Sequence, residues 1–280
     1  DGCSWPEPPL AVLLIPAAEG RAQTRAQGLE DRLALPGSDL ASLKVDVICS
    51  EGTPATQAAQ RATRTIPIVF GGAAFPDQTG LVASLARPGG NLTGVTFVGP
   101  EYGKRLELLR EVSPKVARVA LLYNDHNRAS LLAVEETREW AQALHVTIEA
   151  QGVHDRASLD VALTAVRRSR PDALMTTADP LLASYRQAVV EFAATQRLLA
   201  MYGERSYVST GGLMFYGTST TDMWRRAAVY VDRILRGAKP GDLPVERPTT
   251  FELWINKKTA RTLGLTLPPS VLLRADRVLD

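Results

Sequence analysis

The chain has 280 residues, of which 45% are hydrophobic and 22% charged, and 32 basic against 30 acidic residues leave a net charge of +2. These values are typical of a globular protein of about two domains, and they exclude a largely disordered chain, a coiled coil and a collagen-like repeat. The longest apolar run near the start, residues 10–15, stops at Pro16, well short of the roughly 18 residues of a membrane helix. The sequence therefore predicts a globular protein without a membrane helix.

The basic residues form no block that would attract nucleic acid. The densest group, Arg167, Arg168 and Arg170, falls at a predicted helix end, where positive charge is favourable in any case. We therefore expect no nucleic-acid partner. Two cysteines, Cys3 and Cys49, are too few for a disulfide framework and leave the redox compartment open.

Short apolar runs of strand length alternate along the chain with longer segments of helical periodicity. The predicted strands are residues 10–15, 45–49, 66–70, 116–123, 147–151, 173–177, 198–202 and 213–216. The clearest predicted helices are residues 131–144, 158–168, 181–196 and 223–235. Strand and helix in this order predict an α/β fold of parallel sheets with helices on both faces.

Three changes in composition divide the chain. Residues 87–91 are rich in turn formers, residues 206–212 change character again, and residues 237–248 hold three prolines and two glycines. Three such boundaries indicate two α/β lobes joined by several crossings. We expect the first lobe to comprise residues 1–99 and 208–244 and the second residues 100–207 and 245–280, with hinges near residues 99–100, 206–210 and 245–248.

Residues that follow the predicted strands are the candidates for a binding site, because ligands of open parallel sheets bind beyond the carboxyl ends of the strands. Small and polar residues stand there, including the run Gly52 to Ala55, Gly72, Asn124, Asp179 and Tyr202. Thr53 and Asp179 also read as helix N-caps, since Pro54 and Pro180 follow them. Both interpretations stay open for each residue.

Common enzyme signatures are missing, among them the nucleophile elbow, the phosphate-binding loop and the dinucleotide fingerprint. His126, His145 and His154 are scattered, Cys49 closes an apolar strand, and nothing fixes the separation of Asp179 from Glu51. The sequence thus indicates no catalytic residue, metal site or cofactor. Two other function classes remain as alternatives. One is a small hydrolase or transferase on a doubly wound sheet. The other is the ligand-sensing domain of a regulator. Such a regulator carries a DNA-binding domain before its first strand, and we expect none here, because nine residues precede Leu10.

Two stretches carry a resemblance. The first includes Gly52-Thr53-Pro54-Ala55, Thr65-Ile66-Pro67-Ile68-Val69-Phe70 and the run from Gly80 to Gly94; the second runs from Gly211-Gly212-Leu213-Met214 through Tyr230-Val231-Asp232-Arg233-Ile234-Leu235 to Pro268-Pro269-Ser270. In order and spacing, over about residues 28–280, they resemble the ABC transporter substrate-binding proteins related to the tryptophan- and tyrosine-binding lipoproteins of bacterial uptake systems.

The resemblance implies a periplasmic-binding-protein type I fold, in which two Rossmann-like lobes joined by a three-crossing hinge close on a ligand in the interlobe cleft. It implies a monomer that captures a small ligand, an amino acid or similar small carboxylate, and delivers it to the permease subunits of an ABC importer. It implies further a periplasmic or lipid-anchored extracytoplasmic location, no enzymatic activity and no cofactor.

By the same resemblance, Gly52, Thr53, Pro54 and Ala55 bind the ligand from the first lobe, near Gly72 and Phe75, and Asn124 and Asp179 face it from the second. Asp179 would accept the ligand's ammonium group, and the N–H groups near Thr53 would bind its carboxylate. Tyr216 would close the wall after the last strand of the first lobe, and Phe75 or Tyr202 would add an aromatic surface.

The sequence departs from the family pattern in two places. Phe75-Pro76 stands where relatives usually have Asp-Pro, which shifts the expected ligand specificity. Only residues 16–30 stand where relatives have a helix and an edge strand, so we expect a first lobe that lacks one or both. No secretory signal precedes Cys3, so we expect a mature or trimmed form, or else a cytoplasmic protein.

Overall fold

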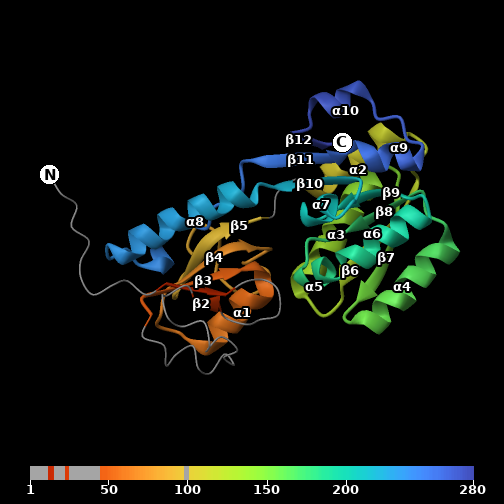
Figure 1. The fold of residues 1–280 in the computed structure, drawn as a ribbon. Helices are drawn as coiled ribbons and strands as arrows, with labels where there is room; N and C mark the ends of the chain where they lie inside the picture. Colours follow the sequence, from red (N-terminus) through yellow and green to blue (C-terminus); the bar gives the residue numbers. More distant parts are fainter. Residues whose placement is uncertain (1–11, 16–22, 25–44, 98–100) are drawn as a thin grey trace. The chain divides into compact units, whose positions relative to one another are not determined.

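The structure, a computed structural model, describes residues 12–15, 23–24, 45–97 and 101–280 (Figure 1). Cys3, most of the segment 16–30 and the hinge expected at residues 99–100 lie outside these residues. The chain forms two compact units: unit 1 comprises Asp1–Val98 and Thr220–Pro248, and unit 2 comprises Gly99–Ser219 and Thr249–Asp280. It therefore passes from one unit to the other three times.

Unit 1 is built on a five-stranded sheet with the order β2-β1-β3-β4-β5. Only β2 runs antiparallel to its neighbour; the other pairs are parallel. The elements are β1 (Val12–Ile15), β2 (Gln23–Thr24), β3 (Val47–Glu51), α1 (Gly52–Ala62), β4 (Ile68–Ala73), β5 (Leu92–Thr96), α8 (Thr220–Leu235) and the 3-10 turn η2 (Pro240–Asp242).

The two faces of this sheet are covered by helices from distant parts of the chain (Figure 1). Alternate side chains of a strand point to opposite faces, so Ile48 and Ile68 pack with Ala55 and Ala59 of α1. Val47 and Val69 pack on the other side with Ala227 and Tyr230 of α8. Both faces are apolar, as expected for a parallel sheet between two helical layers.

Unit 2 is built on a seven-stranded sheet with the order β12-β11-β10-β9-β8-β6-β7. Its elements are α2 (Glu101–Val112), β6 (Arg118–Asn124), α3 (Arg128–Ala143), β7 (Thr147–Val153), α4 (Arg156–Ser169), β8 (Ala173–Thr176), α5 (Pro180–Ser184), α6 (Arg186–Thr195), β9 (Leu199–Tyr202), α7 (Ser206–Ser209), β10 (Met214–Thr218), β11 (Phe251–Asn256), α9 (Lys257–Leu263), α10 (Pro269–Leu273) and β12 (Arg277–Leu279). The pairing is parallel except between β10 and β11.

Strand residues in unit 2 again alternate between two apolar layers. Val119 and Leu121 of β6 pack with α2 and α3, whereas Ala120 and Leu122 pack with α4, α5 and α6. The expected α/β fold of parallel sheets with helices on both faces is therefore confirmed.

Two of the expected domain boundaries were wrong. Residues 208–219 were assigned to the first lobe, but they belong to unit 2, because β10 pairs with β9 and β11. Tyr216 thus lies in unit 2, and residues 206–210 form α7 and its C-cap rather than a hinge. The third boundary falls after Pro248 rather than before Val245, because Glu246 bridges to Val95 of β5.

Of the helix and edge strand expected to be lost from the first lobe, an edge strand is present, because the two-residue β2 forms the edge of the unit 1 sheet. The helix expected to be missing falls among residues that the structure does not describe. In the described residues, the helices are too short or too polar to cross a membrane.

Candidate functional site

In unit 1, the candidate residues gather where β3 ends and α1 begins. Gly52 opens the helix with a φ of 76°, a left-handed conformation that favours glycine. The hydroxyl oxygen of Thr53 accepts a hydrogen bond from the backbone N–H of Ala74 at 2.9 Å. Ser50 and Thr56 bond through their hydroxyl groups at 2.9 Å. The start of α1 is thereby held against the end of β4, with the N–H groups of its first turn at that edge of the sheet.

Gly72 and Phe75 lie beside this helix start in unit 1. Gly72 is the fifth residue of β4 and has a φ of 77°, and a Cβ there would lie 2.9 Å from the sulfur of Met223 in α8. Phe75 is buried and takes a positive φ of 47°, and its carbonyl accepts hydrogen bonds from Thr79 at 2.8 Å. The Phe75-Pro76 pair therefore opens a compact turn directly after β4.

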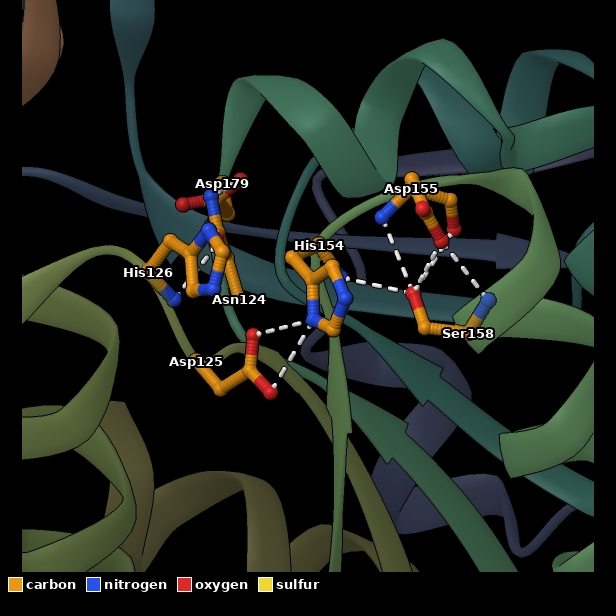
Figure 2. Close-up of polar contacts among 7 residues, drawn as sticks. All are labelled: Asn124, Asp125, His126, His154, Asp155, Ser158 and Asp179. Atoms are coloured by element: carbon orange, nitrogen blue, oxygen red, sulfur yellow. Dashed lines mark hydrogen bonds and ion pairs between the residues drawn. The ribbon is translucent and has the colours of Figure 1, made fainter.

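In unit 2, a buried carboxylate organises the loops that follow β6 and β8. Asp179 caps α5 by accepting a hydrogen bond from the N–H of Leu181 at 2.9 Å. Its Oδ1 also accepts from Asn124 at 3.1 Å, and its Oδ2 accepts from Asn127 at 2.7 Å and from the hydroxyl of Ser130 at 3.0 Å. Four donors fill the four acceptor sites of a carboxylate. Figure 2 shows Asn124 directed at this group.

Neither candidate tyrosine is among the described residues that bond to the carboxylate of Asp179. Tyr202 is buried in the core of unit 2, with its ring stacked on Tyr207 at 4.6 Å between centroids. Burial raises the pKa of both phenols above the usual value. Tyr216 is partly exposed, and its ring stacks on Phe251 at 5.9 Å.

A buried arginine lies next to Tyr216. The Nε atom of Arg105 donates a 2.7 Å hydrogen bond to the carbonyl of Tyr216, and its guanidinium lies 5.3 Å from the centre of the Tyr102 ring. Its Nη1 atom is buried and makes no hydrogen bond within the described structure. An unfilled guanidinium donor suits a carboxylate.

The structure thus sorts the predicted residues into two groups. Unit 1 brings together Gly52, Thr53, Pro54, Ala55, Gly72 and Phe75, and unit 2 brings Asn124 to Asp179. Sequence reasoning missed Asn127, Ser130 and Arg105. Asn127 had a local signal, because asparagine before a helical segment is a preferred N-cap, and its side chain indeed caps α3. Arg105 had none, since an arginine on a helix is normally exposed.

Comparison with known proteins places these features in a family. The family described as "ABC transporter substrate binding protein" matches residues 22–279. A protein named tyrosine-binding protein from Clostridioides difficile (strain R20291) is 28% identical over 228 residues, which is 81% of this chain. The chain spans 66% of that protein's length.

Three solved structures are similar over most of the chain. An ABC domain in complex with L-Trp from Streptococcus pneumonia is 30% identical, with a TM-score of 0.82 over 87% of this chain and 82% of that one. A conserved domain protein from Vibrio cholerae is 28% identical, with a TM-score of 0.82 over 86% and 81%. The ligand-free, open structure of a substrate-binding protein with adhesive properties from Clostridium difficile is 26% identical, with a TM-score of 0.64 over 87% and 81%.

Proposed function

Because the chain belongs to the ABC transporter substrate-binding protein family, we propose that it binds an amino acid outside the cytoplasm and delivers it to the permease of an importer. The match over residues 22–279 carries this proposal. A relative solved with L-Trp and another named for tyrosine support an aromatic amino acid as the ligand. The protein catalyses no reaction, and a periplasmic or lipid-anchored location follows from the same role.

We assign the ligand contacts to the two groups described above. The N–H groups at the start of α1 suit a carboxylate, because the N-terminus of a helix carries partial positive charge. Asp179 supplies negative charge for an ammonium group, and since its oxygens already hold four donors, its first role is to fix Asn124 and Asn127 in place. Arg105 offers a second donor for a carboxylate.

Isothermal titration calorimetry with L-Trp, L-Tyr and L-Phe tests the proposal directly. We expect one site per chain and no binding of tryptamine, which lacks the carboxylate, or of indole-3-propionate, which lacks the ammonium group. Ligand at about 100 times its Kd stabilises the native state by about 2.7 kcal/mol, which raises Tm by several degrees, at about 2–4 °C per kcal/mol.

Thr53→Val tests the helix start without emptying space in the core. It removes the hydroxyl that bonds Ala74, and we expect Kd to rise at least tenfold. Thr137→Val is the matched control, since Thr137 is also buried and, among the residues that the structure describes, its hydroxyl donates to the carbonyl of Ala133 in its own helix. If a folded protein binds no amino acid, or if mass spectrometry shows that the ligand is converted, the proposal is wrong.

A further inference from the structure

Three side chains with metal-binding atoms meet at one corner of unit 2 (Figure 2). One ligand atom each from Asp125, His126 and His154 lies within 4.8 Å of the other two. The side chains are accessible to solvent, with His154 38% and Asp125 32% exposed. The group lies in the loops after β6 and β7, next to Asn124 but outside the hydrogen bonds to Asp179.

The pairing of two parallel strands explains why residues so distant in sequence meet. β6 and β7 run in register, with Asn124 opposite Val153. The next residues are Asp125 and His154, and the pairing continues into them, since the N–H of Asp125 donates to the carbonyl of Val153 at 3.3 Å. His126 follows one position later. β7 lies at an edge of the sheet, and both histidines are exposed to solvent.

Hydrogen bonds donated by the backbone N–H groups of both histidines fix the position of each residue's backbone, from which its ring extends. The N–H of His126 donates to the side chain of Asn124 at 3.0 Å, and the N–H of His154 donates to the hydroxyl of Ser158 at 2.9 Å. The two rings are stacked, 4.4 Å apart between centroids. The Nδ1 atom of His154 lies 3.0 Å from a carboxylate oxygen of Asp125.

Gly152 makes room for the carboxylate. A Cβ at this position would lie 2.6 Å from Oδ2 of Asp125, a distance at which the side chain of Asp125 would have to move. Any other residue in this place in β7 would therefore displace the Asp125 carboxylate from the position in which it bonds to His154. The corner thus combines two imidazoles and one carboxylate with a strand residue that leaves them space.

From this juxtaposition we propose that Asp125, His126 and His154 bind one divalent transition-metal ion, with Zn²⁺ as the physiological candidate. Two nitrogen ligands and one oxygen ligand suit zinc, copper or nickel, whereas Mg²⁺ and Ca²⁺ prefer oxygen ligands alone. Ligands of a tetrahedral zinc ion lie roughly 3.4 Å apart, from metal–ligand distances of about 2.0–2.2 Å. The ligand atoms lie within 4.8 Å of one another and the two rings are stacked, so binding requires the exposed histidine side chains to rotate toward a common point, with water completing the coordination.

Calorimetry with ZnCl₂ on the tag-free, EDTA-treated full chain tests the proposal. We expect one Zn²⁺ per chain, a rise in Tm with Zn²⁺, and no effect of MgCl₂ or CaCl₂ at equal concentration. Co²⁺ provides a spectroscopic probe, because nitrogen and oxygen ligands in a four-coordinate site give visible absorption bands that Zn²⁺ then removes.

Four variants separate the site from adventitious binding. His126→Ala and His154→Ala should each weaken Zn²⁺ binding by at least the roughly 10- to 100-fold that losing even a supporting group near a metal costs. Gly152→Ala removes no ligand atom but should weaken binding by displacing Asp125. His145→Asn, a change at an exposed histidine with a φ of 52°, should bind Zn²⁺ as the unaltered chain does.

The proposal fails if the unaltered chain binds no Zn²⁺ in the micromolar to millimolar range, or if the stoichiometry and affinity survive in His126→Ala and His154→Ala. Thermal unfolding of each metal-free variant shows that it is folded before binding is compared. The Zn²⁺ titration is made without any amino acid, so failure to bind Zn²⁺ would not contradict the proposed function, and failure to bind an amino acid would not contradict the metal site.

Discussion

The side-chain amide of Asn127 donates a 2.7 Å hydrogen bond to Oδ2 of Asp179, and each of these residues is itself the N-cap of a helix. One buried carboxylate therefore ties the start of α3 to the start of α5, across the ends of two neighbouring strands. This arrangement makes Asp179 a residue on which the local fold depends, besides any contact it makes with a ligand.

We expect Asp179→Ala to lower the free energy of unfolding by about 2–6 kcal/mol, because buried donors on Asn127 and Ser130 lose their acceptor at about 1–3 kcal/mol each. Urea titration followed by circular dichroism measures the change. Asp160→Ala, at an exposed pair with Arg156, should stay within about 0.5 kcal/mol. Equal effects of the two substitutions would contradict the role given to Asp179.

The thiol of Cys49 should be inert in the native protein. Cys49 is buried, and burial raises its pKa to about 11, so at pH 8 the reactive thiolate is on the order of one part in a thousand. In a Cys3→Ser background, we expect no reaction with Ellman's reagent until guanidinium unfolds the chain. Rapid labelling of the native protein would show that the sheet of unit 1 opens readily.

Phe70→Ala should destabilise unit 1 by about 3–5 kcal/mol, because Phe70 of β4 is fully buried in the apolar cluster that includes Ala55 and Ala59 of α1. Hydrogen exchange with mass spectrometry should show faster exchange in β3, β4 and α1 and little change in β6 or β8. Phe192→Ala, at a partly buried site on α6, is the control and should affect unit 2 instead. Loss of protection in both units from Phe70→Ala would show that they unfold together.

Asp172 should give stability that depends on pH. The N–H of Ala117, at 2.9 Å, and then that of Arg118, at 2.8 Å, hold the pKa of its carboxyl below the usual value. A carboxyl whose pKa is lower in the folded state adds to the free energy of unfolding at pH values above its unfolded-state pKa of about 3.9. This contribution is lost as the pH falls through the folded-state pKa. The effect is small, below about 1 kcal/mol, because the group is exposed.

Urea midpoints of the unaltered chain and Asp172→Asn should therefore differ at pH 7 and converge as the pH falls through the folded-state pKa. Asp232→Asn, at an exposed pair with Arg236, is the control and should show a small difference throughout. A gap for Asp172→Asn that widens toward acid pH would contradict the sign of the argument.

The apolar runs that alternate with helical segments were sufficient to predict the central strands of both sheets, because each of these strands is buried on both faces. It missed β5, in which Gly94 and two threonines interrupt the apolar pattern, and β11, in which Glu252 follows Phe251. The second domain boundary was wrong for a different reason. The change in composition at residues 206–212 marks a turn within unit 2, and only strand pairing shows to which sheet β10 belongs.

The site divides in the same way. The places of Thr53, Asn124 and Asp179 at the ends of strands were predictable from the sequence, and their contacts with a ligand are part of the proposal. The meeting of His126 with His154 was not, since it depends on the register of β6 against β7. Nothing in either loop shows which strand lies beside it.

The layout of unit 1 also sets an order of events during synthesis. One face of its sheet, including Val47, Val69 and Val95, is covered by α8, yet β5 ends at Thr96 and α8 begins only at Thr220. A ribosome must therefore translate most of unit 2 before that apolar face can be covered. A nascent chain that ends at residue 219 leaves this face of the sheet exposed. Chaperones that bind apolar surface should therefore associate with the growing chain up to that point and dissociate once α8 has been synthesised.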